Sequence, residues 1–264
     1  MFNMIRADIF KMFKMKAVAL CVLASTICAL GIAIMLHGVF KGAISLDGGS
    51  AFALLSDTMI IMILGSVIVG MLICGNFESK NIHDEIACGN GRLAIVLTKT
   101  VSVFLIVTVL TLPYILMSTI GFATNIGFGR YLGVPSAFFD ILSNVPGVEV
   151  TNSYILKSIV LSLLITLTYL AKVSICIPVA FKARKSIAVI MIGFAATFAF
   201  DILSVLTKDI NGLSFLKYLP YSLGYKLTLD CSIHVMIQSA VSSILFIAGM
   251  LIITNLIFRK AEIK

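Results

Sequence analysis

Six long runs of apolar residues divide this chain of 264 residues. Each run is close to the roughly 20 residues that a helix needs to cross about 30 Å of hydrocarbon. The runs are continuous, whereas the strands of a membrane barrel alternate apolar and polar positions over about ten residues. The pattern therefore predicts an all-α integral membrane protein with six transmembrane helices in one domain, residues 1–264. The predicted spans are Ala17–Met35, Ala53–Cys74, Val101–Phe122, Tyr154–Ile177, Ser186–Leu206 and Val235–Phe258.

The composition supports this class. Hydrophobic residues make up 60% of the chain and charged residues 12%. A typical soluble domain is about 45–50% apolar and about 25% charged. A water-soluble fold is therefore excluded.

The net charge of +8 is best explained by membrane topology. If the N-terminus is cytoplasmic, 13 of the 20 basic residues fall on the inner side, as the positive-inside rule requires. We expect both termini in the cytoplasm of a bacterial cell and the chain in its cytoplasmic membrane, and we do not expect a nucleic-acid surface. The inner residues are Arg6, Lys11, Lys14, Lys16, Lys80, Arg92, Lys99, Lys182, Arg184, Lys185, Arg259, Lys260 and Lys264.

Residues 1–16 are expected to form an amphipathic helix that lies in the inner interface. Lys11 and Lys14 fall opposite the apolar face, and Asp8 lies on its flank. Simple positive flanking of the first span is the alternative. A cleaved signal peptide is disfavoured because the next apolar run is as long as a full span and five more follow. The apolar face comprises Phe2, Ile5, Ile9, Met12 and Phe13.

The motifs of several enzyme classes are absent. The sequence has no GxxxxGK[ST] phosphate loop, no HExxH and no GxSxG. Its three histidines, His37, His83 and His234, fall in different loops without metal-ligand spacing. We therefore expect no catalytic residue, no metal site and no bound cofactor in this chain. The six cysteines do not indicate a disulfide framework, because only Cys231 is predicted outside.

Three ionisable residues fall within predicted spans, where charge is costly and often functional. Asp57 and Asp201 lie near the outer ends of the second and fifth spans, and Lys172 lies toward the inner end of the fourth. A substrate or proton pathway is one interpretation. A structural or interfacial role is the other, because side chains near span ends can reach the interface.

Small residues form a strip on the second span. Gly65, Ser66 and Gly70 lie within one segment, and the last two have the small-xxx-small spacing. This spacing favours close helix packing, either within the chain or across a dimer.

The polar interval at residues 76–92 separates the second and third spans. No Gly or Pro interrupts Phe77 to Ala87, and Ile82 and Ile86 have i, i+4 spacing, so a short helix with one apolar strip is expected. Gly89 permits a chain reversal after it. A solvated loop is the alternative. The charged and titratable residues of the interval are Glu78, Lys80, His83, Asp84, Glu85 and Arg92.

This interval resembles the cytoplasmic loop of permease subunits of the type-2 class of ABC transporters, particularly small bacterial ones that handle bacteriocins, lantibiotics and amphipathic peptides. Their loop reads aromatic-x-x-G-T-I, then I-x-x-G-x-x-R, then I-x-L-x-K. The chain departs from it at Lys80 and Asn81, which replace the Gly-Thr pair. The segment LKYLPYSLGYKL at residues 216–227 is similar to the family's Pro-containing outer segment. The matching loop residues are Phe77, Ile82, Ile86, Gly89, Arg92, Ile95, Leu97 and Lys99.

The resemblance implies a coupling helix that inserts into a groove on a separate ATP-binding subunit. A membrane protein without a motor needs such a partner if ATP drives transport, and an apolar strip suits helix-in-groove binding. The implied complex has two ATPase subunits, which carry ATP and Mg, and a second permease copy or paralogue. Its cargo is hydrophobic or amphipathic, such as peptides. The implied coupling residues are Phe77, Glu78, Ile82, Asp84, Glu85, Ile86, Gly89 and Arg92.

Two other functions stay open. An ion-coupled secondary transporter would use Asp57 or Asp201, and a non-transporting scaffold or sensor subunit would only bind partners. The outer segments, residues 123–152 and 207–234, are expected to form short re-entrant or interfacial helices, with an exposed loop as the alternative.

Overall fold

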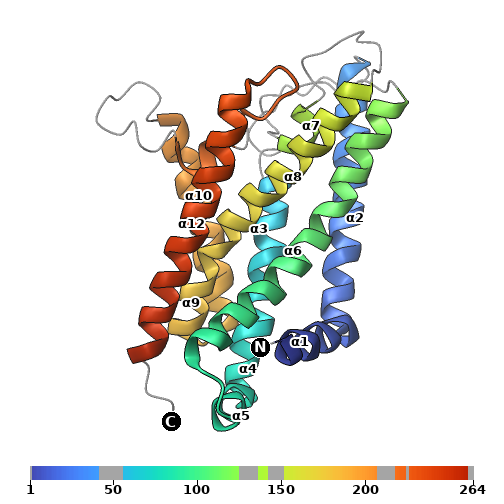
Figure 1. The fold of residues 1–264 in the computed structure, drawn as a ribbon. Helices are drawn as coiled ribbons and strands as arrows, with labels where there is room; N and C mark the ends of the chain where they lie inside the picture. Colours follow the sequence, from blue (N-terminus) through green and yellow to red (C-terminus); the bar gives the residue numbers. More distant parts are fainter. Residues whose placement is uncertain are drawn as a thin grey trace.

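The structure, a computed structural model, describes residues 2–41, 56–124, 136–141, 152–206, 218–223 and 226–260. Every regular element in these ranges is helical, which confirms the all-α prediction (Figure 1). In chain order the helices are α1 (Phe2–Lys14), α2 (Lys16–Phe40), α3 (Asp57–Val69), the π-helical turn η2 (Gly70–Cys74), α4 (Gly75–Glu78), α5 (Asn81–Ala87), α6 (Arg92–Ala123), α7 (Ala137–Asp140), α8 (Asn152–Ser174), α9 (Cys176–Ala183), α10 (Ser186–Leu206), α11 (Pro220–Leu223) and α12 (Ile233–Lys260).

Five helical segments of the described chain are long and apolar enough to cross a membrane. These support the prediction of a multi-pass membrane protein. The remaining predicted span, the fifth, corresponds to α10, whose segment Ser186–Phe200 is a shorter apolar helix. The five long segments are Lys16–Phe40, Asp57–Glu78, Arg92–Gly121, Leu156–Ala183 and Ile233–Lys260.

The span boundaries differ most from the sequence prediction at the start of the third span and at the end of the fourth. The third span begins at Arg92 rather than Val101, because α6 continues through the polar residues before it. The fourth continues through α9 to Ala183. Between α8 and α9 the helix is interrupted after Ser174, because Pro178 lacks a backbone N–H and its ring would clash with the carbonyl four residues earlier.

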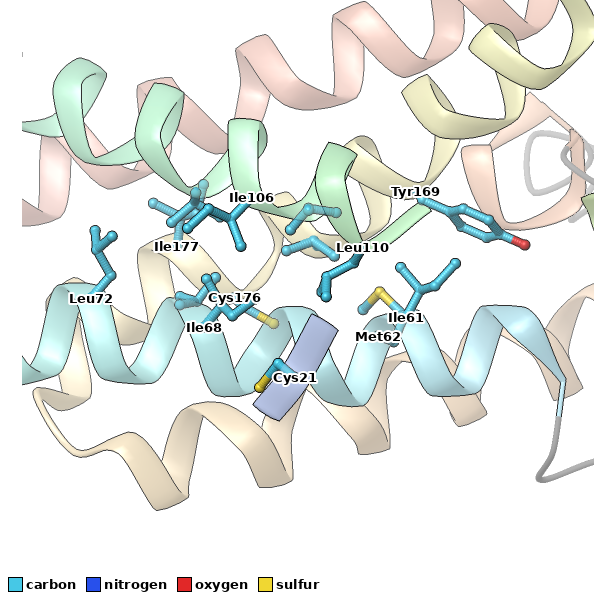
Figure 2. Packing of buried hydrophobic residues seen from close by; sticks show 14 of the residues in the cluster. Cys21, Ile61, Met62, Ile68, Leu72, Ile106, Leu110, Tyr169, Cys176 and Ile177 are labelled. Carbon is cyan, nitrogen blue, oxygen red and sulfur yellow. The ribbon is translucent and has the colours of Figure 1, made fainter. Parts of the chain in front are cut away.

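The centre of the bundle is formed by α3, α6, α8 and α9. Figure 2 shows Ile61 and Met62 of α3 near Leu110 of α6, and Ile177 of α9 near Ile106. Lipid chains are as apolar as leucine, so such helices are held together by close packing and interhelical hydrogen bonds rather than by expulsion of water.

The helices α2 and α12 expose large aliphatic side chains along much of their length. Leu20 and Ile34 on α2 and Ile237 and Leu245 on α12 are among them. Soluble monomers rarely expose contiguous apolar surfaces of this kind. Against hydrocarbon they cost nothing, which agrees with a membrane environment.

One end of the molecule, here called the basic end, brings together α1, the short helices α4 and α5, and the last turns of α9 and α12 (Figure 1). The other end carries the described parts of the two predicted outer segments. There α7 places Phe138 and Phe139 in the core, and α11 does the same with Tyr221. Within these two segments, residues 125–135, 142–151, 207–217 and 224–225 lie outside the described residues.

The small-residue strip packs within this chain. Gly65 faces Val173 of α8, and Ser66 lies against Gly193 of α10. At Gly70 the backbone meets the start of α10, where the Ser186 hydroxyl donates a hydrogen bond of 3.2 Å to the Gly70 carbonyl. These contacts favour intrachain packing over a dimer contact as the reason for the strip.

The change Gly70→Ala should destabilise the subunit by about 1–3 kcal/mol, the usual cost of overpacking. An added Cβ would lie 3.1 Å from the Ser186 Cβ and 3.2 Å from its Cα. The Ser186 backbone cannot easily move away from such a contact. The matched control is Gly75→Ala, since nothing lies within 4 Å of a Cβ there. It should gain about 0.5–1 kcal/mol from helix propensity. Equal thermal midpoints for the two variants in detergent would contradict the packing.

Candidate functional site

The segment between the second and third spans is built from two short helices. The second span runs without a break through η2 into α4, and the chain then turns at Lys80, whose φ is 57°. The expected short helix that carries Ile82 and Ile86 is present as α5, which begins at Asn81, while Phe77 lies before it in the separate helix α4. Gly89, with φ 82°, ends α5 as predicted. We refer to Gly75–Ala87 as the α4–α5 segment.

The Phe77 ring belongs to an aromatic cluster inside the chain. Its centroid lies 5.7 Å from that of Phe181 in α9 and 6.3 Å from that of Phe258 in α12, both edge to face. The Arg184 guanidinium carbon lies 5.0 Å from the centroid of the same ring. Phe77 is only 9% exposed. It joins the α4–α5 segment to the last turns of α9 and α12 and, contrary to expectation, does not offer its ring to a partner.

The apolar strip of α5 also faces inward. Ile82 is fully buried, and the partly buried Ile86 packs against the same core. The idea that this strip inserts into a partner's groove is thus corrected, because the bundle itself occupies it. Glu78 and Asp84 are exposed, so the outer surface of the segment is polar.

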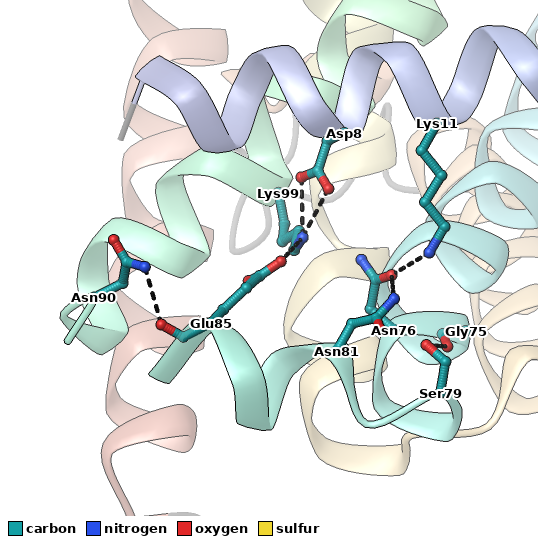
Figure 3. Close-up of polar contacts among 9 residues, drawn as sticks. All are labelled: Asp8, Lys11, Gly75, Asn76, Ser79, Asn81, Glu85, Asn90 and Lys99. Carbon is teal, nitrogen blue, oxygen red and sulfur yellow. Dashed lines mark hydrogen bonds and ion pairs between the residues drawn. The ribbon is translucent and has the colours of Figure 1, made fainter. Parts of the chain in front are cut away.

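A buried lysine holds α5 against α1 and α6 (Figure 3). The Lys99 ammonium, on α6, donates to both carboxylate oxygens of Asp8 in α1, at 2.9 and 3.0 Å. It also donates to Glu85 Oε1 in α5 at 2.5 Å. Lys99 is fully buried, and both carboxylate side chains are mostly buried. We call these three residues the Lys99 cluster. All three ammonium hydrogens have an acceptor, so the positive charge of the buried Lys99 is paired with the neighbouring carboxylates.

The helix α1 has two different apolar surfaces. Met12 and Asp8 are buried against the bundle, whereas Phe2 and Phe13 are 79% and 78% exposed. The predicted helix is present, and the structure shows that the side carrying Asp8 and Met12, rather than the side carrying Phe2 and Phe13, is buried. One side of α1 packs against α6, and the opposite side exposes apolar residues that suit a membrane surface. The first is further fixed by a hydrogen bond of 2.6 Å from Lys11 Nζ to Asn76 Oδ1 of α4.

Arg92 joins the start of α6 to the end of α12 at the basic end. Its Nη1 donates to the carbonyls of Phe258 and Arg259, each at 2.7 Å. These two hydrogen bonds satisfy free carbonyls at the C-terminus of α12.

A second group of polar residues lies deep in the bundle, at the first residue of α3. Asp57 is fully buried, and its carboxylate accepts from the backbone N–H groups of Thr58 at 2.8 Å and Phe138 at 3.1 Å. The Tyr169 hydroxyl lies 3.2 Å from Thr58 Oγ1 and also hydrogen-bonds the carboxylate. Lys172 adds positive charge nearby. We call Asp57, Thr58, Tyr169 and Lys172 the buried polar centre.

Lys172 is deeper than the sequence predicted, because α9 extends the fourth span. Its ammonium lies 5.2 Å from the ring centroid of Tyr169 and 5.5 Å from that of Tyr221. Snorkelling to the interface does not apply to a side chain that is only 1% exposed. Asp201 lies on the backbone of α10, but its side chain is outside the described residues.

Replacing Lys80 by glycine should stabilise the subunit by about 0.5–1 kcal/mol. An L-residue in the left-handed region costs about 1–2 kcal/mol, and glycine avoids this cost at a smaller loss of chain entropy. The loop pattern that the sequence resembles has Gly at this position. Lys80→Ala is the control, because it removes the charge but keeps the Cβ. Equal thermal midpoints for the Gly and Ala variants would show that the backbone at Lys80 is not strained.

Sequence reasoning missed the roles of Asp8 and Lys99. Two features of the sequence could have indicated these roles. Asp8 is an acidic residue in an otherwise basic N-terminal helix, at i+4 and i−4 from Met4 and Met12. Lys99 stands in the apolar run LAIVLTKTVSVF, and a lysine inside such a helix needs a partner.

Within the described ranges, no group of three His, Cys, Asp or Glu residues is placed to hold a metal ion. No protein-family model and no curated protein sequence matches this chain.

Proposed function

We propose that this chain is the membrane-spanning subunit of an ATP-driven exporter of the type-2 ABC class. It has six spans, and both termini and the basic end are cytoplasmic. The observation that carries the proposal is the fixed α4–α5 segment, a short helical projection held by the Lys99 cluster at the end where basic residues gather. The positive-inside rule assigns that end to the cytoplasm. A chain without a phosphate loop depends on a separate subunit for ATP and Mg.

The coupling residues divide into two groups under this proposal. Phe77, Ile82 and Glu85 fix the α4–α5 segment to the bundle, and Ile86 supports them. Glu78 and Asp84 lie on the surface that the ATPase subunit contacts. Arg92 and Gly89 shape the return into α6.

A rigid attachment suits a coupling element because movement of α5 is then passed to the spans. Lys99 connects α5 to α1 and α6, and Phe77 connects α4 to α9 and α12. Closure of two ATPase subunits would tilt these helices together and alternate access. A second permease copy or paralogue completes the complex, and the cargo is a hydrophobic or amphipathic molecule, in particular a peptide.

The proposal is tested by purifying the tagged chain from its own membranes. We expect a phosphate-loop ATPase in equal amount, and about tenfold lower recovery with Asp84→Arg, which corresponds to about 1.4 kcal/mol. Lys14→Glu, an exposed charge reversal on α1, is the control. Purification of the folded chain without any such ATPase would contradict the proposal.

An ion-coupled secondary transporter is the second candidate, favoured by the buried polar centre. Transport would then survive removal of ATP but stop when the ion gradient collapses, and Asp57→Asn would abolish it. Asp230→Asn, at an exposed position, would leave it unchanged. The exporter requires the opposite dependence on ATP and gradient. A scaffold or sensor subunit would move nothing under either condition.

A further inference from the structure

A pocket of about 380 Å³ opens at the basic end between the last turns of α9 and α12. Two apolar residues, Phe181 and Ile257, and three cationic residues, Lys182, Arg184 and Lys260, line it. None of the described lining residues is acidic. The volume lies at the lower end of the roughly 300–1,000 Å³ that hold small ligands.

The positive charge in this pocket exceeds what the helix ends require. Each helix C-terminus carries about half a negative charge, so α9 and α12 together offset about one of the three cations. The end of α12 is already satisfied in part by Arg92, which donates to the Phe258 and Arg259 carbonyls. The exposed ammonium groups of Lys182 and Lys260 carry the positive charge that an anion in the pocket would meet.

The walls of the pocket combine charge with an apolar floor. Phe181 is buried in the floor, and the exposed Lys182 and Lys260 stand at the rim. Next to the pocket, α12 exposes the aliphatic side chains of Ile253 and Leu256. An anionic group in the pocket would thus have a hydrocarbon-compatible surface directly beside it.

We propose that this pocket binds the phosphate headgroup of an anionic phospholipid whose acyl chains lie along α12. Free inorganic phosphate shares the anionic chemistry but cannot use the adjoining aliphatic surface. Basic pockets between membrane helices are suited to such headgroups, each nearby Lys or Arg adding about fivefold to binding. The inference requires that the chain spans a membrane and does not depend on an ATPase partner.

The test uses the purified full chain in detergent and native mass spectrometry. Phosphatidylglycerol, phosphatidylcholine and inorganic phosphate are added separately, and the fraction of protein with one bound lipid is measured. The double variant Lys182→Gln/Lys260→Gln should lower phosphatidylglycerol affinity about 25-fold. The control variant Lys14→Gln/Lys16→Gln removes the same charge from exposed positions outside the pocket and should change it by less than about twofold.

The expected result is one retained phosphatidylglycerol, little phosphatidylcholine, and no displacement by inorganic phosphate. Three results would overturn the inference: equal retention of both lipids, displacement by inorganic phosphate, or equal losses in the two variants. An acidic protein surface as the true occupant would appear as the first of these, since the chain alone would not select the anionic lipid.

Discussion

Replacing Lys99 by methionine should lower the free energy of unfolding by about 3–5 kcal/mol, the usual cost of removing one partner from a buried ion pair. Asp8 and Glu85 would face each other without the ammonium that both now contact. Glu85 Oε2 is already a buried oxygen without a hydrogen-bond partner, so no spare donor is at hand. Unfolding by sodium dodecyl sulfate in mixed micelles measures the loss.

The control is the neutral triple variant Asp8→Asn/Glu85→Gln/Lys99→Met. Removing a buried pair completely is often neutral for stability, so the triple variant should recover most of what the single variant loses. If the triple variant were as unstable as Lys99→Met, the loss would come from packing of the lysine stem. The cluster would then not be held by charge.

Truncating Phe77 to alanine should cost about 3–5 kcal/mol, as is typical of buried aromatic residues. Its ring is enclosed by Phe181 and Phe258, and the change would leave a cavity where α4, α9 and α12 meet. Phe13→Ala removes the same atoms from α1, where the ring is 78% exposed. That change should stay within about 0.5 kcal/mol. The same micelle titration compares the two.

This comparison also separates the two possible roles of Phe77. If it packs inside the chain, the isolated subunit loses stability. If it served only as an anchor for a partner, the isolated subunit would be as stable as the wild type, and only recovery of the ATPase would fall.

Much of the fold could be predicted because a membrane span needs a long apolar run, which is visible in one sequence. The helix ends were less predictable. α6 begins at Arg92 because polar residues can continue a helix when other elements bury them, as α1 and α5 bury Lys99. α9 extends the fourth span because Pro178 interrupts a helix without ending it.

The sequence indicated where the short helix with Ile82 and Ile86 lies, but not that its apolar face is turned toward the bundle. The spacing of Ile82 and Ile86 correctly places them on one face of a helix, yet spacing alone does not say whether the bundle or a partner covers that face. The burial of Phe77 depends on Phe181 of α9 and Phe258 of α12, which lie about a hundred residues or more away in sequence. Contacts at such separations leave no local pattern. The Lys99 cluster was missed for the same reason, since Asp8 lies 91 residues from its partner.

The most direct test of the account uses Cys88, which follows α5 and is the exposed one among six free cysteines. A photoactivatable, cleavable maleimide is attached to it in native membranes, the sample is irradiated, and the captured protein is identified by mass spectrometry, with Cys88→Ala as the control. The account predicts a phosphate-loop ATPase joined to this chain and absent from the control. Capture of the same other proteins with and without Cys88, and of no ATPase, would contradict it.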